Sequence, residues 1–249
     1  MKQIPRKAWN DYRRKMTALS EKASKEMGAW IYAKGGYTMV EFDEAIAYAY
    51  ALATKYGEAS AALAARMYDV VAELSNAAVP LAEVAETATY GEVSKAIYGA
   101  STYSQNEEYI SGVVGRLVKQ AGADTTLQNA RRDGAEFAWI GNGDSCAFCE
   151  LLSANGWVNA SKETIKGNHA EHIHSNCDCQ FMIRFNSDTN VAGYRPNKQL
   201  YYDTEGYTMS EKANTLRRER YARQKDEINE QKRIAYSKRM GNDEDTASE

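Results

Sequence analysis

The sequence predicts an α+β fold that is predominantly α, with an N-terminal helical region, a small zinc-stapled β module and an extended C-terminal helix. Long stretches of good helix formers fill the first 134 residues. All four cysteines and all three histidines lie between Cys146 and Cys179. A highly charged stretch follows near the C-terminus. These observations divide the chain into regions 1–134, 135–186 and 187–249.

The first region is expected to consist of helices joined by short breaks. Apolar residues recur at helical spacing, and Gly35–Gly36 and Gly122 interrupt the pattern. Pro80 suits the first turn of a helix, where its missing N–H costs nothing. The predicted helices span residues 5–33, 40–74, 81–97, 106–120 and 125–132.

The second region is expected to be a small β module. Residues 136–140 are short, aromatic and alternating, and turn-forming residues follow at 141–144. Two more short strands are predicted at 156–158 and 180–185. Three short strands bury little apolar area, so a module of this size commonly needs a staple.

The last region begins with a polar segment, residues 186–208, predicted to cross the molecule in an extended form. A helix is predicted from Ser210 to about Arg239, followed by an acidic, disordered tail at 241–249. The helix carries ten basic against five acidic side chains and is polar nearly all round. Such a helix either solvates itself through ion pairs or binds a partner surface. The predicted contact residues for nucleic acid or a partner are Arg217, Arg218, Arg220 and Arg223.

Composition and charge limit the function. The chain has 249 residues, 43% hydrophobic and 26% charged, which is ordinary globular usage. A formal charge of −3 excludes a uniformly basic nucleic-acid binder but allows basic ends around an acidic middle. No run of about 18 apolar residues predicts a membrane span, and no export signal is evident. Close-set cysteines in a reducing cytoplasm are more often metal ligands than disulfides.

The cysteines and histidines follow a zinc-site spacing. Cys146 and Cys149 form a C-x2-C pair, and His174, Cys177 and Cys179 form H-x2-C-x-C about 25 residues later. Two separated pairs that close a loop are typical of one structural Zn²⁺. Cys146, Cys149 and Cys177 are three ligands, and the fourth is His174, slightly favoured, or Cys179. The alternative is a set of reduced cysteines in a small core.

A catalytic zinc would need an open coordination position and a general acid or base. Glu171, between His169 and His172, is the nearest candidate base, but neither H-E-x-x-H nor the deaminase-type H-x-E pattern occurs. The zinc is therefore predicted to be structural, and the protein is predicted not to be an enzyme.

The same residues resemble a known family. Residues 144–151, Asn155–Gly156 and residues 172–179 resemble the C-terminal motif region of MuF-like minor head proteins of tailed bacteriophages. Ser175 and Asp178 stand where that family has proline and arginine. The resemblance covers about residues 136–185.

This resemblance implies a minor capsid or head morphogenesis protein, present in few copies and associated with the portal. It would act inside the virion capsid, after assembly in the host cytoplasm. Its partners would be the portal and other phage head proteins, with packaged DNA as a further candidate and no membrane. The alternatives are a nucleic-acid-binding zinc protein or a metal-dependent nuclease.

Overall fold

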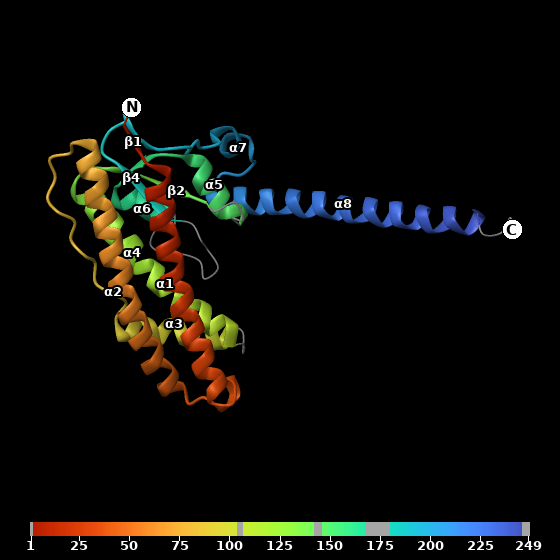
Figure 1. Ribbon diagram of the computed structural model, residues 1–249, viewed down its shortest axis with the longest axis horizontal. Helices are drawn as coiled ribbons and strands as arrows, with labels where there is room; N and C mark the ends of the chain where they lie inside the picture. Colours follow the sequence, from red (N-terminus) through yellow and green to blue (C-terminus); the bar gives the residue numbers. More distant parts are fainter. Residues whose placement is uncertain (1, 104–106, 142–145, 168–179, 246–249) are drawn as a thin grey trace.

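Three long helices form the body of the protein (Figure 1). The computed structural model describes residues 2–103, 107–141, 146–167 and 180–245. The helices of the body are α1 (Arg6–Ala33), α2 (Phe42–Ser75) and α4 (Glu107–Arg132). A short 3-10 helix, η1 (Tyr37–Met39), follows α1, and α3 (Tyr90–Tyr103) precedes α4. These elements confirm that the N-terminal region is helical.

α1 runs antiparallel to both α2 and α4. Tyr56 donates a hydrogen bond to Glu26, and Ser60 lies 3.7 Å from the Met16 sulfur, so later positions of α2 meet earlier positions of α1. Tyr68, late in α2, donates to Asp133, just after α4 (2.8 Å). Because a late position of α2 meets the end of α4, these two helices are parallel.

α4 is one continuous helix, so the predicted break at Gly122 is wrong. Gly122 lies against α1 and α2: a Cβ there would be 2.3 Å from Met16 Cε and 2.7 Å from Ser60 Oγ. Gly115, two turns earlier, would place a Cβ 2.3 Å from Ser24 Oγ. These glycines permit close helix contact and do not end the helix.

Residues 77–89 are extended and α3 begins only at Tyr90. The helix predicted over 81–97 is therefore wrong for residues 81–89. α2 ends at Asn76, whose φ of 53° is left-handed. The chain must then return along the body so that α4 can run parallel to α2. Thirteen extended residues span about 43 Å, whereas thirteen helical residues span about 20 Å. A helix would be too short for this return.

α4 supplies polar partners to the backbone of this connecting segment. Asn129, 1% exposed, accepts a hydrogen bond from Glu83 N (2.9 Å) and donates one to Glu83 O (2.7 Å). Thr125 Oγ1 accepts from Ala85 N (3.0 Å), and Asp69 on α2 accepts from Ala82 N (2.8 Å). Glu83 and Ala85, two residues apart in the segment, thus bind Asn129 and Thr125, four residues apart in α4. The spacing fits because two extended residues and four helical residues each advance about 6 Å.

We expect Asn129→Ala to lower the free energy of unfolding by about 2 kcal/mol, because it removes the acceptor of the part-buried Glu83 N–H and the amide that also donates to Thr125 O inside α4. Gln128→Ala is the matched control: Gln128 donates to the same Glu83 oxygen (3.0 Å) but is exposed. This control should change the free energy by less than about 0.5 kcal/mol. Urea unfolding of both variants is the measurement. Equal losses would contradict the role assigned to Asn129.

The predicted strands at 136–140 and 180–185 are confirmed as two adjacent strands of a three-stranded antiparallel sheet, with the first of them in the centre. β2 (Glu136–Ile140) pairs with β4 (Gln180–Arg184) and with β3 (Val158–Asn159), which begins two residues later than predicted. Glu136 and Arg184 lie opposite each other in register and form an ion pair (2.5 Å). Two short helices, α5 (Ala147–Asn155) and α6 (Lys162–Gly167), lie within this region and were not predicted.

The segment 186–208, predicted to be extended throughout, contains two regular elements. β5 (Thr189–Val191) pairs in parallel with β1 (Lys2–Ile4). α7 (Lys198–Asp203) begins where Asn197 Oδ1 accepts a hydrogen bond from Leu200 N (3.3 Å). The strand β5 depends on a distant partner, because it forms where the N-terminus of the chain pairs with it.

The C-terminal helix is confirmed as α8 (Met209–Asp245), and it extends five residues into the predicted disordered tail. Its first three turns pack on α5 through Ala213 and Leu216, which are 2% and 3% exposed. From Tyr221 to Ile234 every residue is exposed. Figure 1 shows this part leaving the body as a long arm.

A hydrophobic cluster joins the helical body to the small sheets. It includes Trp9, Phe137, Leu151, Val191 and Leu216, which come from all three predicted regions. A second cluster lies farther along α1, α2, α3 and α4. The sheet region is thus packed against the end of the helical body formed by the start of α1 and the ends of α2 and α4. The site described next lies at this junction.

Candidate functional site

The first cysteine pair begins α5. Cys146 is the N-cap residue of α5, and its Sγ accepts a hydrogen bond from Cys149 N (3.5 Å). Cys146 is exposed, whereas Cys149 is 2% exposed. The positive end of a helix favours negative charge on a sulfur placed there. The chemistry of this pair therefore fits two thiolate ligands of a metal ion.

The other predicted ligands, His174, Cys177 and Cys179, lie outside the described residues, as do His169, Glu171 and His172. Within the described ranges, no group of three or more His, Cys, Asp or Glu side chains could hold a metal ion. The zinc site stays a prediction with two of its residues located.

The four arginines predicted on the C-terminal helix do not form one site. Arg217 donates to Asn214 (2.8 Å) and Arg223 to the Glu219 carbonyl (3.5 Å), both on the exposed surface of α8. Arg218 is also exposed. Arg220 differs, because it faces α5 and forms an ion pair with Glu150. Only Arg220 of these four lines the cavity described next.

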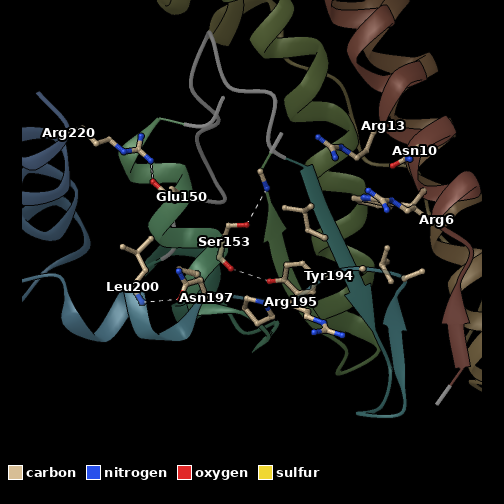
Figure 2. A pocket seen from close by; sticks show the side chains of 18 residues that line it. Arg6, Asn10, Arg13, Glu150, Ser153, Tyr194, Arg195, Asn197, Leu200 and Arg220 are labelled. Carbon is tan, nitrogen blue, oxygen red and sulfur yellow. Dashed lines mark hydrogen bonds and ion pairs between the residues drawn. The ribbon is translucent and has the colours of Figure 1, made fainter. Parts of the chain in front are cut away.

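A cavity of about 400 Å³ opens between α1, α5, the segment after β5 and α8 (Figure 2). Its charged residues are Arg6, Arg13, Arg195, Arg220 and Glu150. Asn10, Asn197, Trp9, Tyr194 and Ser153 are among its other lining residues. We refer to this cavity as the arginine pocket.

Parallel pairing of two distant strands builds the arginine pocket. β1 pairs with β5 so that Ile4 lies beside Val191. Because the strands are parallel, the chain leaves both of them at the same edge. Arg6 follows β1 by two residues and Arg195 follows β5 by four, so the pairing brings them to one side of the molecule. A hydrogen bond from Ala192 N to Ile4 O (3.2 Å) extends the pairing of the two strands to Ala192, which lines the arginine pocket.

The opposite wall of the arginine pocket is held by α5. Ser153 Oγ donates to Trp139 O (2.9 Å) and accepts from Gly141 N (3.2 Å). Tyr194 donates from its hydroxyl to Ser153 O (3.2 Å). Burial raises the pKa of Tyr194 well above its usual range, with a smaller opposing effect from Arg184. Tyr194 is therefore a neutral donor that fixes the segment after β5 against α5.

The arginine pocket has an excess of positive charge. Among the described residues, four guanidinium groups line it against one carboxylate, Glu150, which is paired with Arg220. Arg6 and Arg195 are exposed, and neither forms an ion pair within the described part of the chain. Figure 2 shows Arg6 and Arg13 reaching from α1 and Arg220 approaching from the opposite side. The arrangement can hold an anion.

Sequence reasoning missed Arg6, Arg13 and Arg195. The available signal was the basic N-terminus, where residues 2–25 carry eight basic side chains against two acidic ones. That signal does not select which basic residues converge. Arg6 and Arg195 are separated by 189 positions, and no local motif links them.

A protein-family model described as VG15 protein matches residues 3–204. The chain belongs to the VG15 protein family. This is a viral gene protein family, which supports the predicted phage origin at that level. The matched range contains the helical body, both small sheets, the Cys146–Cys149 pair and most of the arginine pocket. It stops before α8. No curated protein and no solved structure matches this VG15-family chain.

Among the described residues of this VG15-family protein, no helix combines the length and apolar character needed to cross a membrane.

Proposed function

We propose that this phage protein is a minor capsid or head morphogenesis component, associated with the portal inside the head. The observation that carries the proposal is the arm formed by α8. Residues 221–245 would extend about 37 Å as a helix. Its exposed part is polar with scattered apolar residues, Tyr221, Ile228 and Ile234. Such a helix serves to contact another molecule more readily than to stabilise its own domain.

The VG15 family match supports a phage context, and the cysteine motif supports the narrower resemblance to minor head proteins. In this proposal the body of the protein packs into the head assembly, and the α8 arm contacts a neighbouring head protein such as the portal. Assembly takes place in the host cytoplasm and leaves the protein in the virion.

The proposal includes one structural Zn²⁺. Cys146, Cys149 and Cys177 would be ligands, with His174 or Cys179 as the fourth. The ion would tie the start of α5 to the chain before β4 and so staple the small sheet. No catalytic step is assigned to it.

The test is the protein content of purified virions. We expect the full chain in mature particles, in a few copies relative to the major capsid protein, measured by quantitative mass spectrometry. A phage in which the gene carries a stop codon at Tyr221, which removes the exposed arm and leaves Ala213 and Leu216 packed on α5, should form fewer filled heads than wild type. Absence of the chain from purified particles, with normal heads from the truncated gene, would contradict the proposal.

Nucleic-acid binding is a second candidate function, because the arginine pocket offers guanidinium groups to an anion. It is compatible with the first candidate, since a protein inside the head lies next to packaged DNA. The pocket, and not the exposed arginines of α8, is the feature that favours it.

A further inference from the structure

We infer that the arginine pocket binds a phosphate group of a nucleic-acid backbone, with Arg6 and Arg195 in direct contact with it. The inference deepens the proposed function and rests on it in one respect: packaged DNA is the nucleic acid that a head protein would meet.

The charge distribution supports an anionic ligand. Arg6 and Arg195 reach the same cavity from the ends of two strands, and neither has a carboxylate partner among the described residues. An anion bound in this cavity would be attracted by both guanidinium groups, which would lower the energy of the site. Glu150 does not cancel this charge, because it is already paired with Arg220.

The donor geometry favours phosphate. The oxygens of a phosphate group accept hydrogen bonds from several directions, and one guanidinium group can donate two parallel hydrogen bonds to them. Arg6 and Arg195 lie on different elements, α1 and the segment after β5, and the Asn10 and Asn197 amides are also at the wall. Donors on separate walls suit a tetrahedral anion better than one flat carboxylate.

The size and apolar walls favour a nucleotide within a chain over an isolated ion. A cavity of about 400 Å³ exceeds the volume of one phosphate several-fold, and Trp9, Ile140 and Tyr194 line it beside the arginines. Trp9 and Ile140 are almost fully buried, so the half-buried Tyr194 offers the aromatic surface on which a sugar or base adjoining the bound phosphate would pack.

The arginine pocket also lies where a long polymer can enter. Arg6 and Arg195 are exposed, and the α8 arm leaves the body next to Arg220, carrying further basic residues along its length. The pocket would fix one phosphate, and the attraction would come from the pocket itself, because residues 221–245 of the arm carry six basic and six acidic side chains.

The test is DNA binding by the full chain, measured by fluorescence anisotropy with a labelled single strand of roughly 20 nucleotides and the matching duplex. The variant is the double substitution Arg6→Gln and Arg195→Gln. Its matched control is Arg217→Gln with Arg218→Gln, which removes the same charge from the exposed surface of α8. Circular dichroism confirms that both variants are folded.

We expect the pocket variant to bind the single strand about tenfold more weakly, with a salt slope that falls by about one for each phosphate that is no longer neutralised. The control should bind within about twofold of wild type. Equal weakening in both variants would overturn the inference, because it would indicate a diffuse charge effect. Binding of pyrophosphate without binding of either DNA would also overturn it, as would binding of a polyglutamate peptide in place of DNA.

DNA binding and the virion measurement can fail separately. If the chain is absent from virions but the pocket variant alone loses DNA binding, the head assignment fails and the phosphate site stands. If the chain is in virions and both variants bind DNA equally, the reverse holds.

Discussion

Replacing Cys146 with serine is expected to abolish binding of the proposed zinc ion and to unfold the region around α5 and the three-stranded sheet. Serine is among the best N-cap residues, so it can replace the capping role of Cys146 at the start of α5. The loss would therefore come from the metal and not from the cap. It should clearly exceed the ~1 kcal/mol that loss of a cap alone costs.

The measurements are zinc content by mass spectrometry and near-ultraviolet circular dichroism, to which the packing of Trp139 and Trp157 contributes. Wild type should contain about one zinc per chain. A chelator should reproduce the effect of Cys146→Ser, while the far-ultraviolet signal of the long helices remains. Wild-type protein that is purified without zinc, and keeps its near-ultraviolet spectrum in chelator, would rule the site out.

Separate His174→Ala and Cys179→Ser variants identify the fourth ligand. The residue whose replacement abolishes zinc binding is the fourth ligand. Full zinc retention in both would show that neither is required.

Gly122→Leu is expected to lower the free energy of unfolding by about 3 kcal/mol. Even a Cβ at Gly122 would lie 2.3 Å from Met16 Cε and 2.7 Å from Ser60 Oγ, and the backbone oxygen of Ser60 is at 3.3 Å. Met16 can move, but the α2 backbone cannot without separating α2 from α4. Leucine is a better helix former than glycine by about 0.8 kcal/mol. A decrease in the free energy of unfolding would therefore come from the steric conflict with α1 and α2 and not from helix propensity.

The matched control for this prediction is Gly99→Leu on α3, where an added Cβ meets no atom within 4 Å. The control should leave stability unchanged or raise it slightly. Urea unfolding of the two variants beside wild type provides the comparison. A Gly122→Leu protein within about 1 kcal/mol of wild type would show that α1, α2 and α4 can separate at little cost.

Helical periodicity predicted α1, α2 and α8 to within a few residues, because each helix carries its own repeating pattern of apolar or charged side chains. The alternation at 136–140 and 180–185 predicted the adjacent strands β2 and β4 in the same way. These features depend on neighbours in the sequence, so they are visible without the fold.

The connecting segment shows why other parts were not predictable. Pro80 and the residues after it look locally like a helix start, yet Asn129, Thr125 and Asp69 bind the backbone of this segment as an extended chain. Gly122 looks like a helix stop, yet α4 continues through it, and its missing side chain permits close packing against α1 and α2. In both cases the deciding partner is distant in the sequence.

The sequence alone determined the helical character of the body, the strands β2 and β4, the long charged helix and the two thiols that begin the predicted zinc site. Only the tertiary structure decided which charges converge. Arg6 and Arg195 come to one cavity because β1 and β5 pair in parallel, and Arg220 turns to Glu150 because Ala213 and Leu216 fix the start of α8 on α5. Local patterns determine which elements form, but a site built at the junction of four elements depends on pairing between segments that lie far apart in the chain.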